Sequence, residues 1–192
     1  MENIKVAPKF KTQFLSDIVP DDPGIKELKH WCREFEKNGL MPCHAGGSFG
    51  NLSFRTGEDE FIITASGFKD PSSKDSFVAV SSVDPEKKMV YGRGKKQPSS
   101  ESMLHYMIYR KRKDINAVFH GHCEKILKNA YKIDAPSTLK EEPYGTIELA
   151  QSVLDVLGKN NFLIIKDHGF ISLGESMDKA GELALKILRR AY

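Results

Sequence analysis

Apolar residues recur every three or four positions in four segments of the chain, and this spacing predicts four helices. The last segment is the most regular, with apolar residues at positions 180, 183, 184, 187 and 191, on one face of a helix. The predicted helices begin at Pro23, within Pro98–Glu101, at Thr146 and at Ser176. In the second helix we expect Ser99 and Ser100 to act as caps and Glu101 to lie in the first turn.

Short apolar or alternating segments between these helices predict strands. We expect a strand in FVAVS, a hairpin around Asp84-Pro85 within residues 81–92, and a nearly continuous apolar strand over residues 161–174 that is broken at Asp167–Gly169. Further strands are predicted in GNLSFR, EFIITASG and INAVFHGH. Hairpins and helices around one sheet predict a single α/β or α+β domain over residues 23–192. Residues 1–22 have no clear period, and we expect an N-terminal arm that either wanders or lies against a neighbouring surface.

Composition and charge exclude few classes of function. The chain has 192 residues, 40% of them hydrophobic and 29% charged, and its formal charge of +3 is too small to require a nucleic-acid partner but suits a small anionic substrate. No apolar stretch approaches the roughly 18 residues that span a bilayer, and the N-terminus lacks the apolar core of a secretory leader. Three cysteines in no spaced framework are typical of reduced thiols. We therefore expect a cytoplasmic protein with no membrane partner.

The sequence FHGHCEKI, residues 119–126, places two histidines two positions apart on a predicted strand. Side chains at i and i+2 project from the same face of a strand, so His120 and His122 are expected to point together and Cys123 away from them. Three histidine nitrogens with one open position form a catalytic zinc site. The pair therefore predicts a metal centre that needs one more ligand from elsewhere in the chain.

The third ligand could come from His30, His44, His105 or His168. A lone histidine is more often a surface residue or a hydrogen-bonded core residue than a ligand. We expect His30 at the surface of the first helix and His44 in a loop without a positioned companion. We prefer His168, because it ends an apolar strand and the following Gly169 leaves open backbone beside it.

Three turns carry small or amide side chains whose free backbone N–H groups could bind an anion. They contain Asn51, the pair Ser66-Gly67 and the pair Ser99-Ser100. Each alone is more often a plain cap or turn, but together they could hold a phosphate if the fold brings them to the histidines. Glu101 would then stand at a helix start that faces the anion, and His105, on the same helical face, could orient it.

The ordered motifs GNLSFR, ITASG, PSSE, H-x-H and DHG resemble the class II aldolase/adducin family, from about Gly24 to the C-terminus. The resemblance implies a three-layer α/β/α sandwich with a largely antiparallel sheet, and homotetramers with active sites between subunits. It implies zinc, or another divalent metal, on His120, His122 and His168, with Glu101 as the catalytic acid/base. The implied phosphate pocket consists of Asn51, Ser66, Gly67, Ser99 and Ser100.

The activity that the resemblance implies is cleavage of a small ketose 1-phosphate, such as L-fuculose 1-phosphate, to dihydroxyacetone phosphate and an aldehyde. Zinc would act as a Lewis acid on the substrate oxygens, and Glu101 would exchange the carbon-bound proton of the enediolate. A second hypothesis keeps this site for a dehydratase of the methylthioribulose-1-phosphate type, or for an epimerase. A third is a non-catalytic, adducin-like binding domain, and the complete set of histidines argues against it.

The chain departs from the family pattern after the histidine pair. Only residues 123–167 separate His122 from His168, fewer than we expect for a fuculose phosphate aldolase. The missing stretch is where that enzyme supplies a tyrosine proton donor from a neighbouring subunit. Tyr131 and Tyr144 are the tyrosines that remain here, and the sequence does not assign either of them to the donor. Asp167 stands where an asparagine is common. These departures bear on the aldehyde half of the substrate.

Overall fold

The structure, a computed structural model, describes residues 8–192. Its strands are β1 (Lys11–Ser16), β2 (Cys43–His44), β3 (Gly47–Ser48), β4 (Gly50–Arg55), β5 (Phe61–Thr64), β6 (Phe77–Asp84), β7 (Met89–Arg93), β8 (Ala117–Gly121), β9 (Phe162–Ile165) and β10 (Gly169–Gly174). Its helices are α1 (Gly24–Lys37), α2 (Ser102–Lys111), α3 (Glu124–Lys128), α4 (Ile147–Leu157) and α5 (Met177–Arg190), with a short 3-10 helix η1 (Ala130–Lys132).

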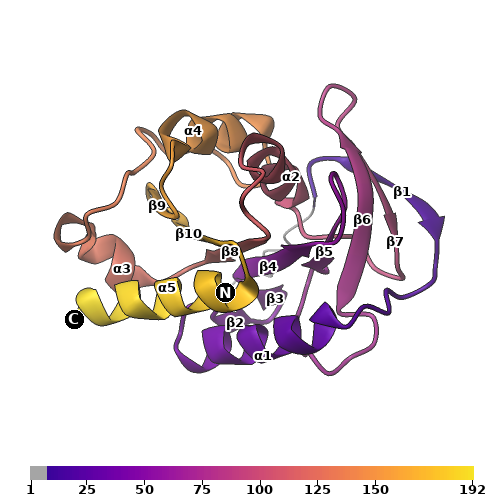
Figure 1. Ribbon diagram of the computed structural model, residues 1–192, viewed down its shortest axis with the longest axis horizontal. Coiled ribbons are helices and arrows are strands. Elements are labelled where there is room, and N and C mark those ends of the chain that lie inside the picture. Colours follow the sequence, from indigo (N-terminus) through magenta and orange to yellow (C-terminus); the bar gives the residue numbers. More distant parts are fainter. Residues whose placement is uncertain (1–7) are drawn as a thin grey trace.

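Eight strands form a central sheet in the order β1-β7-β6-β5-β4-β8-β10-β9. In the described part of the chain β1 pairs with β7 in parallel, and the other neighbours in this sheet pair antiparallel. Helices α2 and α4 cover one face, and α1 and α5 cover the other (Figure 1). The prediction of a three-layer α/β/α sandwich with a largely antiparallel sheet is confirmed.

Each face of the sheet has its own hydrophobic core, and the alternation of side chains along β8 separates them. Phe119 joins the core under α1, α3 and α5, whereas Val118 joins the core under α2 and α4. His120 lies two residues from Val118 and therefore projects to the same side. A fully buried histidine is thus placed on the face that α2 covers.

The helix starts at Thr146 and Ser176 are confirmed as side-chain caps, because their hydroxyls accept from the N–H groups of Leu149 (3.1 Å) and Lys179 (3.2 Å). The predicted start of α2 is wrong by a few residues. The helix begins at Ser102, and Glu101 occupies the N-cap position without a side-chain cap bond.

The segment before α2 cannot be helical, because it is held against the end of β5. A bridge joins Ala65 to Pro98, and the N–H of Ser99 donates to the carbonyl of Thr64 at 3.1 Å. Ser99 and Ser100 therefore lie in the loop before the helix rather than capping it. The Ser99 hydroxyl accepts from the N–H of Glu101 at 3.4 Å, which ties the glutamate to this loop.

Of the two alternatives for the N-terminal arm, the described part supports contact with a neighbouring surface. Residues 11–16 form β1 at the edge of the sheet, and Phe10 is buried in the core under α2 and α4. Residues 1–7 of the predicted arm lie outside the described residues. Within residues 8–192, no helix is both long and apolar enough to cross a bilayer.

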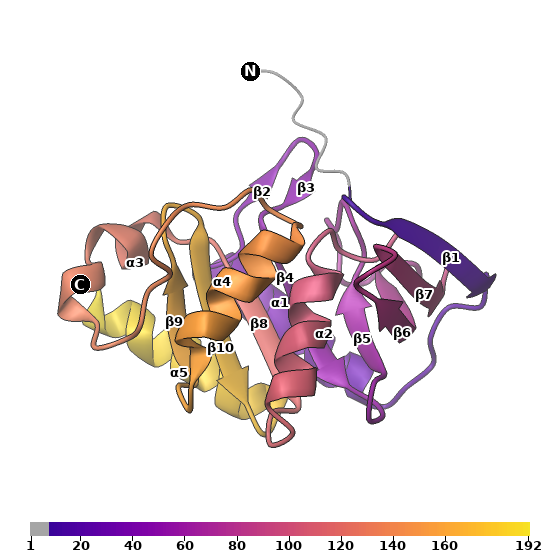
Figure 2. The same cartoon turned by 90° about the horizontal axis from the view of Figure 1, so that it is seen from above.

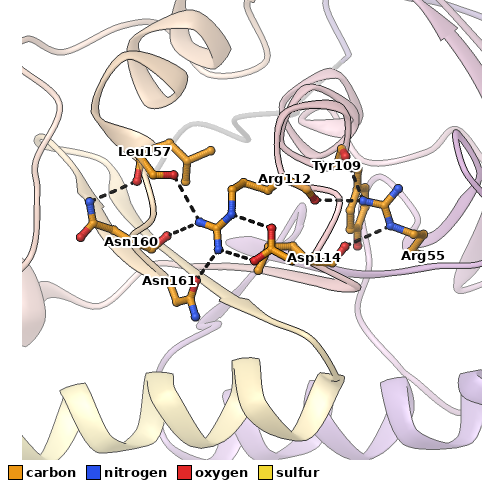
Figure 3. Close-up of polar contacts among 9 residues, drawn as sticks. Arg55, Tyr109, Arg112, Asp114, Leu157, Asn160 and Asn161 are labelled. Atoms are coloured by element: carbon orange, nitrogen blue, oxygen red, sulfur yellow. Dashed lines mark hydrogen bonds and ion pairs between the residues drawn. The ribbon is translucent and has the colours of Figure 1, made fainter.

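Two arginines fasten the C-terminal end of α2 (Figure 3). Arg112 pairs with Asp114 at 2.7 Å and donates to the carbonyl of Asn160, in the loop after α4, at 3.0 Å. Arg55, at the end of β4, donates to the carbonyl of Tyr109 at 2.9 Å. Because one end of α2 is anchored to both β4 and the α4–β9 loop, its other end, which carries Glu101, has a fixed position over the sheet.

Candidate active site

Three histidines converge where β8 ends and the β9–β10 hairpin turns. The ligand nitrogens of His120, His122 and His168 all lie within 4.8 Å of one another. Two of the other three candidates for the third ligand lie elsewhere: His30 is exposed on α1, and His105 is buried in α2, where its Nδ1 bonds the hydroxyl of Ser53 at 2.7 Å. The structure thus brings together the three histidines that the sequence singled out.

Two glycines allow β8 and β10 to approach closely enough for this convergence. A Cβ atom at Gly169 would lie 2.4 Å from the carbonyl oxygen of Gly121 and 2.9 Å from the ring of His120. A Cβ atom at Gly121 would lie 2.5 Å from the ring of Phe170. Neither position has room for a side chain.

The turn that carries His168 depends on a residue in the left-handed region. Asp167 has φ of 55°, a conformation that aspartate and asparagine adopt more readily than most residues. This requirement explains physically why either residue can stand before His168. The hairpin is closed by the N–H of His168, which donates to the carbonyl of Ile165 at 3.1 Å.

The nitrogens of His120 and His122 that face one another are close enough to share one proton or one cation. Nδ1 of His120 donates to the carbonyl of Phe170 at 2.9 Å, which leaves Nε2 unprotonated. This Nε2 lies 2.9 Å from Nε2 of His122. Burial, together with the smaller effect of the neighbouring histidines, lowers the pKa of His120 to about 3 and that of His122 to about 2. Both rings are therefore neutral at pH 7.

A divalent cation fits this donor set. Neutral His122 can place its one ring proton on Nε2 and donate to Nε2 of His120; with that proton on Nδ1 instead, the lone pairs of both Nε2 atoms are available to a cation. A third imidazole and a nearby carboxylate complete a set typical of zinc. Oε1 of Glu101 is also buried without a hydrogen-bond partner in the described residues, 3.4 Å from Nε2 of His168.

Glu101 is held by β4 rather than by its own helix. Its side chain is buried, with Oε2 3.1 Å from Nε2 of His120, and the side-chain amide of Asn51 donates to the same Oε2 at 2.8 Å. The expectation that His105 orients Glu101 is wrong. Asn51 and Ser53 project from the same face of β4, so Asn51 reaches the glutamate and Ser53 engages the histidine one turn later.

The residues predicted to bind phosphate line one cavity of about 570 Å³ with Glu101, His122 and His168. They are Asn51, Ser66, Gly67, Ser99 and Ser100. The bridge between Ala65 and Pro98 brings the two serine-containing turns together. The two turns are distant in the sequence, and the pairing just after the end of β5 places them side by side.

Residues 26–191 match the family described as Class II Aldolase and Adducin N-terminal domain. The chain belongs to this family. It is 29% identical to an L-fuculose phosphate aldolase of Haemophilus influenzae, over 81% of this chain and 74% of that protein. It is 28% identical to a 5-methylthioribulose-1-phosphate/5-deoxyribulose-1-phosphate aldolase of Rhodospirillum rubrum, over 73% of this chain and 68% of the relative. The relatives support an enzymatic role.

Solved structures support the same fold. An L-fuculose 1-phosphate aldolase superposes with a TM-score of 0.74 over 90% of this chain and 85% of its own, at 23% identity. One further relative is much longer than the match: a fluorothreonine transaldolase of Streptantibioticus cattleyicolor is 29% identical over 73% of this chain, which corresponds to 22% of its own length.

In this class II aldolase/adducin family member, the loop before α4 supplies a wall of the cavity. Tyr144 lines the cavity with Glu141 and Glu142, whereas Tyr131 is 82% exposed and is not among the lining residues. A Cβ atom at Gly145 would lie 2.8 Å from the carbonyl oxygen of Ser100, so this loop packs against the predicted phosphate turn. The structure thus separates the two tyrosines that the sequence left as alternatives.

The expectation that His44 has no positioned companion is wrong. Its ring stacks on that of Phe49, with centroids 4.0 Å apart, and both residues line the cavity. Cys123 is buried as predicted, although β8 has ended before it and its place at the start of α3 removes it from the histidines. No sequence pattern indicated a role for Phe49, because an aromatic residue beside a glycine-rich turn does not by itself indicate a functional site.

Proposed function

We propose that the protein is a zinc-dependent aldolase that cleaves a small ketose 1-phosphate, of the L-fuculose 1-phosphate type, to dihydroxyacetone phosphate and an aldehyde. The observation that carries the proposal is the position of Glu101, whose carboxylate lies 3.1 Å from His120 and 3.4 Å from His168. This carboxylate stands at the wall of a cavity to which the turns at Ser66-Gly67 and Ser99-Ser100 contribute small, uncharged side chains. The names of the fuculose phosphate and methylthioribulose phosphate aldolases among its relatives support the same class of reaction.

His120, His122 and His168 would hold zinc or another divalent metal, with an open position toward the cavity. Such an ion supplies Lewis-acid polarisation of the substrate carbonyl. The protein's own contribution is to keep the rings of His120 and His122 neutral by burial and to fix the tautomer of His120 through the carbonyl of Phe170. By family resemblance we also infer a cytoplasmic homotetramer.

Glu101 would move the proton at the carbon that loses its bond to the aldehyde. Asn51 engages Oε2, whereas Oε1 has no hydrogen-bond partner among the described residues. Oε1 is therefore the oxygen that would carry the proton. Cleavage breaks the bond between the third and fourth carbons of the ketose, and the proton from Glu101 would then convert the enediolate to dihydroxyacetone phosphate. Acid–base catalysis of this kind contributes typically about 10²–10⁴-fold.

The phosphate would lie against the turns that contain Ser66-Gly67 and Ser99-Ser100, with Asn51 between them and the metal ligands. The expectation that these turns offer only free N–H groups is wrong, because the N–H groups of Ser66 and Ser99 donate to the carbonyls of Gln97 at 2.8 Å and Thr64 at 3.1 Å. The backbone donors that could bind the phosphate are therefore those of Gly67 and Ser100, and N–H groups at turns bind anions well. Fixing the phosphate would hold the carbonyl end of the substrate next to Glu101. Less orientation would then remain to be achieved at the barrier.

A metal analysis with a product screen tests the proposal. The purified protein is expected to contain a divalent metal and to release dihydroxyacetone phosphate from L-fuculose 1-phosphate or a related ketose 1-phosphate, followed with a coupled reductase assay. Loss of water without cleavage of a carbon–carbon bond would instead support the dehydratase. Interconversion of stereoisomers would support an epimerase. A protein with neither bound metal nor turnover would instead support the non-catalytic, adducin-like binding domain.

Tyr144 is the tyrosine of this stretch that can act on the aldehyde half within one subunit, because it lines the cavity. We predict that Tyr144→Phe lowers kcat for cleavage by about 10- to 100-fold, because the variant lacks the hydroxyl that would exchange a proton with the oxygen of the leaving aldehyde. Tyr131→Phe is the matched control, because that residue is exposed and outside the cavity. Steady-state cleavage rates of the two variants decide the point. Equal rates would remove Tyr144 from the reaction.

A further inference from the structure

The three histidines of the site are oriented by different means. The ring of His120 is fixed by a hydrogen bond from Nδ1 to the carbonyl of Phe170. The hydrogen bonds of residues 8–192 include none to Nδ1 of His122, whose backbone N–H donates to the carbonyl of Leu40 at 2.8 Å. The backbone position of His122 is therefore set, but its ring needs another restraint.

An aromatic ring supplies that restraint. Phe49 stacks on His122 with centroids 5.5 Å apart and planes at 29°. Phe49 also stacks on His44, with centroids 4.0 Å apart and planes at 21°. We call these three rings, joined pairwise through Phe49, the Phe49 stack. It begins in the hairpin of β2 and β3, which projects beyond the ends of the central strands (Figure 2).

The Phe49 stack is itself anchored at Phe49 and at His44. The N–H of Phe49 donates to the carbonyl of Pro42 at 2.9 Å. The ring of His44 is fixed because its Nδ1 accepts from the N–H of Gly46 at 3.1 Å. A rigid ring held against one face of His122 restricts rotation of that imidazole about its last torsion, which is otherwise broad.

We propose that Phe49 is a positioning residue that orients His122 for metal binding through ring stacking, with His44 as its support. The inference rests on the proposed function, because it assumes that the three histidines hold a metal. Phe49 lies outside the sequence motifs that contain the proposed metal ligands. Partners that orient ligating histidines typically contribute about 10- to 100-fold in metal affinity.

Cobalt(II) titration of the metal-free full-length protein tests the inference without any substrate. Phe49→Leu keeps apolar volume and removes the stacked ring, and we expect it to weaken cobalt affinity by about tenfold or more and to alter the visible spectrum of the bound ion. Phe49→Tyr restores a stacked ring and is expected to recover both. Competition with a chromophoric chelator measures the affinities.

Phe68→Leu is the matched control. Phe68 lines the same cavity but packs on Phe77, with centroids 6.0 Å apart, rather than on a histidine. Its cobalt affinity and spectrum should match those of the wild type. Denaturant unfolding of the metal-free variants shows whether each one folds. A metal affinity for Phe49→Leu equal to that of the wild type, or an equal loss in Phe68→Leu, would overturn the positioning role. A wild-type protein that binds no cobalt would overturn the proposed function itself.

Discussion

Glu101→Gln is expected to retain its divalent metal and to lose about 10²–10⁴-fold in kcat, the range for a lost acid–base group. Glutamine has the shape of glutamate, and its amide oxygen can still accept from Asn51, which donates at 2.8 Å in the structure. What it cannot do is carry a proton on the second oxygen, which has no partner among the described residues. Metal content and the release of dihydroxyacetone phosphate are measured on the same preparation.

The control for this variant is Glu142→Gln. Glu142 lines the same cavity and pairs with Lys140 at 2.7 Å, so it tests whether removing any carboxylate from the cavity slows the enzyme. We expect most of the turnover to remain. If Glu101→Gln turns over as fast as the wild type, Glu101 has no acid–base role. If it loses metal as well, its effect is on the centre rather than on proton transfer.

His120→Ala is expected to lower metal affinity by at least about a hundredfold, because binding free energies of about 10–16 kcal/mol at zinc sites are shared among a few ligands. Release of dihydroxyacetone phosphate should fall with the metal. Metal per subunit after dialysis against a weak chelator measures the first effect. His30→Ala is the control, because His30 is exposed on α1, away from the cavity.

Because His120 is fully buried, alanine at this position leaves a cavity and could disturb the fold. His168→Ala removes a ligand with 11% side-chain exposure from a hairpin turn, and it should give the same loss of metal with less loss of stability. Circular dichroism of both variants checks the fold. Metal binding at wild-type affinity in either folded variant would contradict the ligand set.

Local sequence predicted the elements whose cause is local. Thr146 and Ser176 cap their helices, and the strands around Asp84-Pro85 form a hairpin, since turns and caps depend on neighbouring residues. The break at Asp167–Gly169 was predicted, but the chain reverses there, so that the predicted single strand is the antiparallel pair β9 and β10. β1 was not predicted because its cause is distant. Its residues 11–16 pair with residues 89–93, and its own pattern of exposed and half-buried residues has no period to mark it.

In the site, too, the features with a local cause could be predicted and those with a distant cause could not. The strand period predicted that His120 and His122 act together, and the glycine after His168 favoured it as their partner. Contacts between elements could not be predicted: the bond from Asn51 to Glu101 requires β4 to lie under α2, and the stacking of Phe49 requires a hairpin to fold back. The start of α2 was predicted too early, because the β-bridge between Ala65 and Pro98 keeps the residues just before the helix out of it.

The close approach of β8 and β10 at Gly121 and Gly169 has a consequence for which mutations the protein tolerates. A single methyl group at residue 169 would meet the carbonyl oxygen of Gly121 at 2.4 Å, so the two strands would have to separate. All three imidazoles would remain in such a variant, yet His168 would move away from the other two. The weakest points of the centre are thus two positions that contribute no ligand atom, and a variant judged only by its intact histidines would be wrongly counted as functional.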